Sequence, residues 1–112
     1  MRPDSSQREI EPRDRMLWVD MLAEAGRLWA GDLAADDPMA SPLNGDVSAL
    51  PPTDVWVGTD DILWVDAQRF AERAGSRVTL HEAAKMQHVW PLLPLVPEAK
   101  VARREIIERC RT

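Results

Sequence analysis

The chain has 112 residues, a common size for one compact domain, of which 45% are hydrophobic and 29% are charged. This composition is typical of a globular protein and argues against disorder. Fourteen Lys and Arg residues against nineteen Asp and Glu residues give a net charge of −5, which argues against binding to nucleic acid or to an anionic membrane surface.

A single cysteine, Cys110, rules out an internal disulfide and a cysteine-based zinc site, and we expect no cofactor. No apolar run approaches the length of a membrane span, and the polar first residues do not resemble a secretory signal, so we expect a cytoplasmic protein. The five glycines stand at positions 26, 31, 45, 58 and 75, and no two are four apart. The sequence therefore contains no G-x-S-x-G nucleophile elbow, no G-x-G-x-x-G and no P-loop.

The first half of the chain is predicted to hold one helix. Residues 1–12 are polar and lack periodicity, so we expect an irregular lead-in. Apolar residues at helical spacing predict an amphipathic helix over 14–30, with Asp14 capping its first turn and Gly31 ending it. The connection over 31–52 exceeds the usual loop length, which indicates a binding loop, a surface-wrapping segment or a hidden helical turn.

The second half is predicted to alternate strands with helices. Short β-favouring runs predict strands over 54–58 and 77–81, and helical spacing predicts helices over 62–74 and 97–110. A strand–helix–strand order joins parallel strands, so the fold class is α/β. Because parallel strands are normally buried in larger sheets, these two resemble one end of a doubly wound sheet whose centre is missing.

Five tryptophans stand at positions 18, 29, 56, 64 and 90. Large aromatic side chains dominate protein cores, so we expect most of them to be buried. The alternatives are a stacking platform or, for Trp18 with Trp29, a wall of an acyl-binding pocket.

Two histidines are candidates for chemistry. His81 opens H-E-A-A-K, which is similar to the zinc-binding H-E-x-x-H, but Lys85 replaces the second ligand. We therefore expect His81 to be a solvent-facing residue at a strand end. His88 lies in a loop after the second strand, where an imidazole can act as a general base near neutral pH. A packed or solvated side chain is the alternative for His88.

Asp60 and Asp61 follow the first strand, at the sheet edge where open α/β sheets place ligands. One of them can cap the next helix, and the other can hold one ring nitrogen of His88 while the second nitrogen accepts a proton. We pair Asp60 with His88. The pair lacks a nucleophile, because the serines fall in loops without an elbow and Cys110 ends a helix, where the dipole disfavours a thiolate.

Several short motifs occur together between residues 41 and 90: S-P-L, Leu-Pro-Pro before a strand, G-x-x-D after it, and a histidine followed by an aromatic residue. With them, residues 11–110 resemble the C-terminal third of α/β-hydrolases of the hormone-sensitive-lipase-like branch. The resemblance implies a partial α/β-hydrolase fold, with residues 1–12 as a lead-in and 13–112 as a C-terminal segment of the hydrolase domain. It also implies that helix 14–30 shapes the cap and the acyl pocket.

The same resemblance implies that Asp60 is the acid and His88 the base of a catalytic triad. Asp61 stands where relatives often have proline or another acidic residue, so the choice between the two aspartates stays open. Relatives carry H-G-G-G and G-D-S-A-G motifs upstream, and this sequence contains neither.

We therefore expect a truncated or split carboxylic-ester hydrolase that is inactive alone, because the nucleophile and oxyanion hole supply most of the rate in acyl transfer. A companion chain would supply the nucleophile, and short acyl esters would be the substrates. The alternative is a non-catalytic remnant or interaction module that pairs through exposed strand edges, as a homodimer or with another chain.

Overall fold

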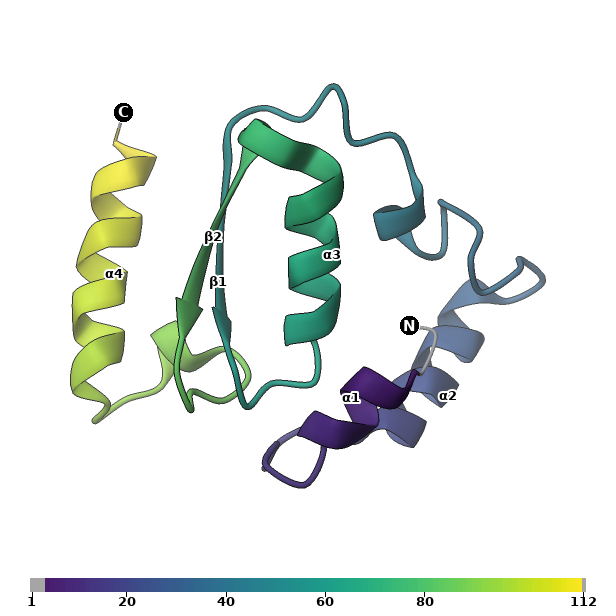
Figure 1. Cartoon of the computed structure of the whole chain (residues 1–112), viewed down its shortest axis with the longest axis horizontal. Helices are drawn as coiled ribbons and strands as arrows, with labels where there is room; N and C mark the ends of the chain where they lie inside the picture. Colours follow the sequence, from purple (N-terminus) through teal and green to yellow (C-terminus); the bar gives the residue numbers. More distant parts are fainter. Residues whose placement is uncertain (1–3, 112) are drawn as a thin grey trace.

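The structure, a computed structural model, describes residues 4–111 (Figure 1). In chain order its α-helices and strands are α1 (Ser5–Ile10), α2 (Val19–Ala30), β1 (Thr53–Gly58), α3 (Trp64–Ala74), β2 (Val78–Ala83) and α4 (Pro97–Cys110). Single-turn 3-10 helices lie at Pro42–Asn44, Gly75–Arg77 and Trp90–Leu92. The first of these is a short helical turn within the long connection, which was one of the expected alternatives.

The two strands are parallel and pair in register from Thr53 opposite Val78 to Gly58 opposite Ala83. Helix α3 provides the crossover between them, and Figure 1 shows α3 on one side of the strands and α4 on the other. The predicted α/β class and strand–helix–strand–helix order are therefore confirmed, with strand boundaries displaced by one or two residues.

The predicted irregular lead-in is wrong for residues 5–10, which form α1. Asp4 and Gln7 cap this helix reciprocally, since the Asp4 carboxylate accepts the Gln7 backbone N–H at 3.1 Å and the Gln7 side chain accepts the Asp4 N–H at 3.3 Å. Such a capping box starts a helix that is too short to show periodicity. Ile10 then packs into the core.

The helix predicted over 14–30 begins five residues later, at Val19. Asp14 does cap a turn, because its Oδ1 accepts the N–H groups of Met16 and Leu17, but that turn does not continue as a helix. The first N–H of α2 instead binds Glu11 Oε1 at 2.7 Å. A side chain from the preceding segment thus sets the start of the helix.

Two hydrophobic clusters hold the fold together. The first joins the three helices on one side of the sheet and contains Ile10, Val19, Ile62 and Val65, with Leu17, Leu22 and Trp64 packed against them. The second lies between the strands and α4 and contains Trp90, Ala99 and Ala102, with Trp56, Ala83, Met86, Leu93 and Val96 around them.

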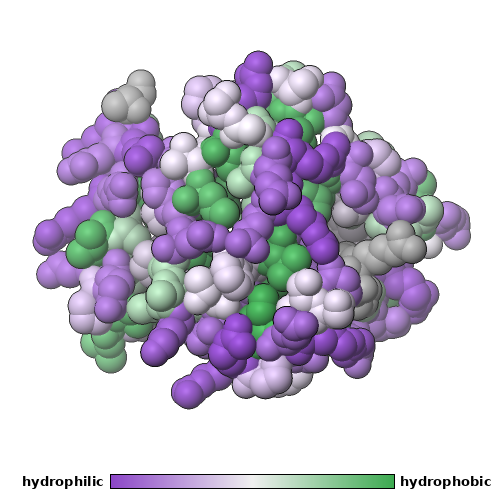
Figure 2. All heavy atoms as spheres, in the orientation of Figure 1, coloured by the Kyte–Doolittle hydropathy of each residue, from purple (hydrophilic) through white to green (hydrophobic). Residues whose placement is uncertain are grey.

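Much of the apolar surface of α2 stays outside these clusters. Trp29 is 79% exposed, and Leu28 and Met21 are also exposed, so the predicted apolar stripe does not face the core in this structure. The expectation that most tryptophans are buried is wrong, because Trp90 alone among the five is buried and Trp18 and Trp29 are exposed. Figure 2 shows hydrophobic patches between polar side chains on the face drawn. Within residues 4–111 no helix combines the length and the apolarity that crossing a membrane requires.

Candidate active site

Two loops meet at the carboxyl ends of the strands. We call residues 59–63, which follow β1, the acid turn, and residues 84–89, which follow β2, the base loop. Parallel pairing brings the ends of the two strands together, so loops that are distant in sequence become neighbours at one edge of the sheet.

Hydrogen bonds continue the sheet ladder into the two loops. The N–H of Thr59 donates to the carbonyl of Ala83 at 3.0 Å, and the N–H of Asp60 donates to the carbonyl of Met86 at 3.1 Å. The N–H of Lys85 donates to Thr59 Oγ1 at 2.8 Å. The loops are therefore fixed relative to each other by two backbone hydrogen bonds and by the Thr59 hydroxyl.

Gly58 allows this close approach. A Cβ atom at this position would lie 2.0 Å from the carbonyl oxygen of Met86, well inside van der Waals contact. Any larger residue would push the base loop away from the acid turn.

The two loops bring Asp61 and His88 together, with Asp61 Oδ2 2.9 Å from His88 Nδ1. The Asp61 side chain is only 5% exposed, whereas that of His88 is 30% exposed. A carboxylate only accepts hydrogen bonds, so Nδ1 carries the proton and Nε2 keeps a free lone pair. The arrangement can therefore accept a proton at Nε2 while the carboxylate stabilises the resulting imidazolium.

Asp61 also fills the capping role that the sequence assigned to one of the two aspartates. Its Oδ1 accepts the N–H of Leu63 at 2.8 Å, at the start of α3. One carboxylate thus fixes the helix start with one oxygen and the imidazole with the other.

The structure pairs His88 with Asp61 and not with Asp60, which was the predicted partner. The carboxylate of Asp60 instead faces Arg13, with Oδ1 3.0 Å from Nε. The two aspartates follow each other in a turn in which the N–H of Asp61 donates to the carbonyl of Gly58 at 3.2 Å, and their carboxylates bind different partners. The sequence did contain the signal, because the G-x-x-D motif counted from Gly58 ends at Asp61.

Two residues of the base loop adopt the left-handed conformation without being glycine. Lys85 has φ 61° and Val89, directly after His88, has φ 49°. This conformation is unusual for a β-branched residue, and each such position costs about 1–3 kcal/mol. The loop keeps this shape because the surrounding contacts hold it, which is common where a side chain must be presented for function.

The second histidine forms a separate pair on the sheet. His81 Nε2 lies 2.7 Å from Asp54 Oδ1, and its ring stacks on Trp56 with centroids 4.2 Å apart. The hydrogen bond with His81 is the main reason that the pKa of Asp54 lies below its usual value. His81 is therefore a half-buried, partnered residue and not the solvent-facing one expected. Among residues 4–111 no cluster of three or more potential metal ligands is found.

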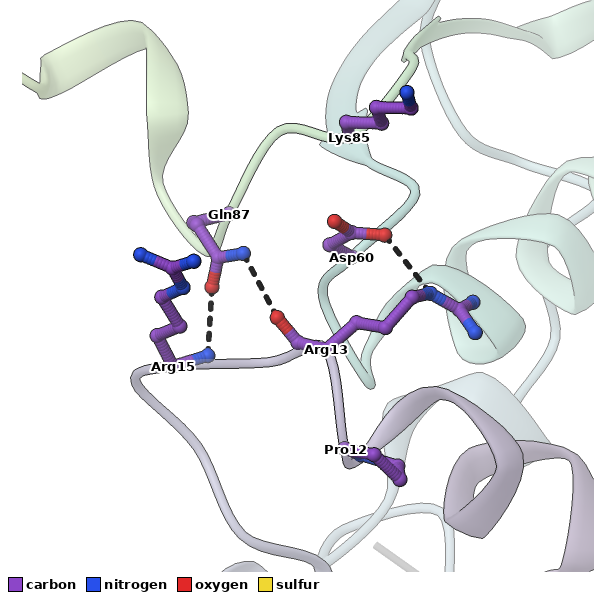
Figure 3. A pocket seen from close by; sticks show the side chains of 6 residues that line it. All are labelled: Pro12, Arg13, Arg15, Asp60, Lys85 and Gln87. Atoms are coloured by element: carbon purple, nitrogen blue, oxygen red, sulfur yellow. Dashed lines mark hydrogen bonds and ion pairs between the residues drawn. The ribbon is translucent and has the colours of Figure 1, made fainter.

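A cavity of about 530 Å³ opens beside the acid turn and the base loop (Figure 3). It is lined by Pro12, Arg13, Arg15, Asp60, Lys85 and Gln87. Three cationic side chains against one carboxylate make this rim positive, although the whole chain carries a net charge of −5. Such a rim attracts negatively charged groups in solution.

Comparison with known proteins identifies the class. Residues 1–92 match a family with the alpha/beta hydrolase fold, and the chain belongs to this family. The family resemblance and the fold predicted from sequence are thereby confirmed.

Relatives include esterases and lipases. An acetyl-hydrolase of Streptomyces hygroscopicus is 38% identical over 87 residues, which cover 71% of this chain and 29% of that protein. An esterase of Acinetobacter venetianus is 33% identical over 104 residues, 88% of this chain and 34% of that protein. The crystal structure of a hormone-sensitive lipase from a metagenome library matches 93% of this chain and 37% of its own, with a TM-score of 0.85 and 30% identity. The chain spans about a third of the length of these relatives.

Proposed function

We propose that this chain carries the acid and the base of a carboxylic-ester hydrolase. Asp61 orients His88, and His88 Nε2 takes the proton from a serine hydroxyl that lies outside this sequence. The contact of 2.9 Å between a buried carboxylate and Nδ1, at the joined ends of two parallel strands, carries this proposal. Relatives named acetyl-hydrolase and esterase favour short acyl esters as substrates.

The proposed chemistry follows from which nitrogen is held. With Nδ1–H bound to Asp61, Nε2 removes the serine proton as the oxygen attacks the ester carbonyl. The imidazolium that forms is stabilised by the carboxylate and then protonates the leaving alcohol. In the second half-reaction Nε2 activates water, which releases the acid and regenerates the serine.

The nucleophile has to come from elsewhere because the sequence holds no G-x-S-x-G elbow. We expect residues 1–112 alone to be inactive, and the missing half to come from a companion chain or from the same polypeptide if it is longer. In the part of the chain that the structure describes, the sheet has two strands, and helices flank it on both sides. Further strands can therefore join only at an edge of β1 or β2.

A chimera tests this proposal. The chain would replace the matching segment of the Streptomyces hygroscopicus acetyl-hydrolase, and hydrolysis of a chromogenic acetyl ester would be measured. We expect the chimera to be active and His88→Ala to lower turnover by about 10⁶-fold, because the serine loses its base.

His81→Ala is the matched control, because His81 belongs to the other carboxylate–imidazole pair and should leave turnover nearly unchanged. A chimera that keeps its activity after His88→Ala would refute the proposed base. The chain alone would also be treated with a fluorophosphonate probe, and covalent labelling of one of its serines would show that the nucleophile is already present.

A second candidate is a non-catalytic interaction module, which the unpaired strand edges and the exposed apolar residues of α2 favour. Such a module would form homodimers or bind another chain through a strand edge. Sedimentation over a range of concentrations measures whether the chain dimerises, and the chimera measures hydrolysis. A chain that dimerises and gives an inactive chimera supports the interaction module. An active chimera supports the hydrolase.

A further inference from the structure

A short segment before α2 contacts the acid turn through a buried carboxylate. Asp14 is only 7% exposed. Its Oδ1 accepts the N–H groups of Met16 and Leu17 at 2.8 and 2.9 Å. Its second oxygen, Oδ2, accepts the N–H of Ile62 at 2.9 Å, across 48 positions of sequence. Ile62 directly follows Asp61, so this bond holds the peptide beside the acid.

The same segment also contacts the base loop. Gln87, directly before His88, accepts the N–H of Arg15 through Oε1 at 2.7 Å and donates from Nε2 to the carbonyl of Arg13 at 3.0 Å (Figure 3). Arg13 in turn binds the carboxylate of Asp60, also visible in Figure 3. Residues 13–15 therefore touch the neighbour of the acid and the neighbour of the base.

We infer that residues 13–15, the strap, hold Asp61 and His88 in their mutual orientation, with Asp14 and Gln87 as positioning residues. The inference rests on the proposed function, because it assigns these residues to the acid–base pair. Neither residue touches the imidazole in this arrangement, and both act through the residue next to a member of the pair.

The geometry favours positioning over a purely local role. The local turn needs only Oδ1 of Asp14, whereas Oδ2 binds Ile62 in a buried place where an unpaired N–H would be costly. Gln87 bridges two backbone groups on either side of Asp14, so the strap cannot shift relative to one loop without shifting relative to the other. Supporting contacts of this kind fix the orientation of functional side chains in other sites, and their loss typically costs about 10–100-fold in function.

The test uses the whole chain with ¹⁵N-labelled histidine, at a pH where both imidazoles are neutral. In the wild type we expect the ¹⁵N shifts of His88 to report mainly the Nδ1–H tautomer, because Asp61 accepts that proton. Asp14→Ser keeps a hydroxyl that can cap the local turn but has no second oxygen for Ile62. We expect His88 in this variant to move toward the tautomer mixture of a solvated imidazole.

Two controls separate positioning from general destabilisation. His81 is an internal reference, because its contact with Asp54 lies elsewhere on the sheet and its shifts should not change. Asp37→Ser is the matched variant, since Asp37 Oδ1 accepts the N–H of Met39 in a similar local turn, and it should leave His88 unchanged.

Gln87→Leu provides a second route that does not depend on the buried carboxylate. It removes both bridges to the strap, and we expect it to shift His88 in the same direction. In the active chimera each variant should lower kcat by about 10–100-fold with little change in KM.

An unchanged His88 tautomer in folded Asp14→Ser and Gln87→Leu would overturn the inference, and Gln87→Leu alone decides if Asp14→Ser does not fold. The tautomer is read without any nucleophile present. The inference about the strap is therefore tested by the His88 tautomer, whereas the proposed function is tested by the turnover of the chimera after His88→Ala, and the two can fail independently.

Discussion

The chain contains two aspartate–histidine pairs that are alike in chemistry and in spacing. Asp54 and His81 are 27 positions apart, as are Asp61 and His88, and the two contacts measure 2.7 and 2.9 Å. Both pairs join the β1 segment to the β2 segment. Spacing and distance alone therefore do not separate a candidate active site from a structural contact.

Their surroundings do separate them. His81 lies in the regular part of the ladder, directly opposite Trp56, on which its ring stacks. Asp54 also binds Arg109 of α4 at 2.9 Å, so this pair ties the sheet to the last helix. His88 instead lies in a loop past the strand end, followed by the left-handed Val89. The comparison teaches that the end of the sheet and the strained loop, more than the pair itself, indicate function.

The largest expected effect would confirm which aspartate serves His88. In the chimera, Asp61→Asn should lower turnover by about 10⁴-fold, because an amide no longer fixes the Nδ1–H tautomer or stabilises the imidazolium. Asp60→Asn removes only the partner of Arg13 and should change turnover far less. Steady-state hydrolysis of the acetyl ester measures both, and a larger loss for Asp60→Asn would reverse the assignment.

A smaller effect is expected from separating the two loops that hold Asp61 and His88. Gly58→Ala places a methyl group against the carbonyl of Met86 and should destabilise the chain by about 1–3 kcal/mol, while disturbing the tautomer of His88. Urea unfolding and ¹⁵N shifts measure the two effects. Gly45→Ala, where the nearest atom is 3.2 Å away, should cost less and leave His88 unchanged. Equal effects of the two variants would contradict the role of the close approach at Gly58.

The smallest effect concerns the structural pair and depends on pH. The pKa of Asp54 lies below its usual value because of His81 and, to a lesser extent, Arg109. The folded chain therefore binds fewer protons at Asp54 than the unfolded chain does, and this contact stabilises the fold above the unfolded pKa of about 3.9. Its contribution is lost as the pH falls through the lowered pKa.

Asp54→Asn should accordingly lower the melting temperature slightly at neutral pH, and the difference from wild type should begin to shrink below about pH 4 and disappear once the pH lies below the lowered pKa of Asp54. Thermal unfolding from neutral to acid pH measures the change, and Asp32→Asn, which lies outside the Asp54–His81 pair, is the control. A difference that persists unchanged in acid would show that the ionised form of Asp54 does not matter. Turnover of the chimera should not respond to Asp54→Asn.

The parts of the fold that follow local rules were predictable from sequence. A proline pair and a glycine bound β1, a glycine precedes β2 and a proline starts α4, and the order of these elements indicates parallel pairing. Helix α1 was missed because its six residues are too few for a periodic pattern and depend on the reciprocal cap of Asp4 and Gln7. The apolar side of α2 was expected to be buried, but periodicity indicates an apolar face without saying what covers it.

The candidate site was predictable to within one residue. His88 could be placed at the end of a strand from the sequence, whereas the choice between Asp60 and Asp61 depends on which way each side chain points. That direction is fixed by the contact between the acid turn and the carbonyl of Met86, which is far away in the sequence. The roles of Asp14 and Gln87 depend on contacts that are equally distant and gave no local signal.

The bond between Asp14 and Ile62 also has a consequence for the order of folding. The two strands pair across 25 positions with α3 between them, whereas this bond closes a longer loop of 48 positions, and longer loops cost more conformational entropy to close. The relative orientation of acid and base should therefore mature late, after the sheet has formed. A protease cut in the exposed connection between α2 and β1 would leave the strap, with α1 and α2, joined to the sheet only through non-covalent contacts, among them the packing of Ile10 and Val19 in the first cluster.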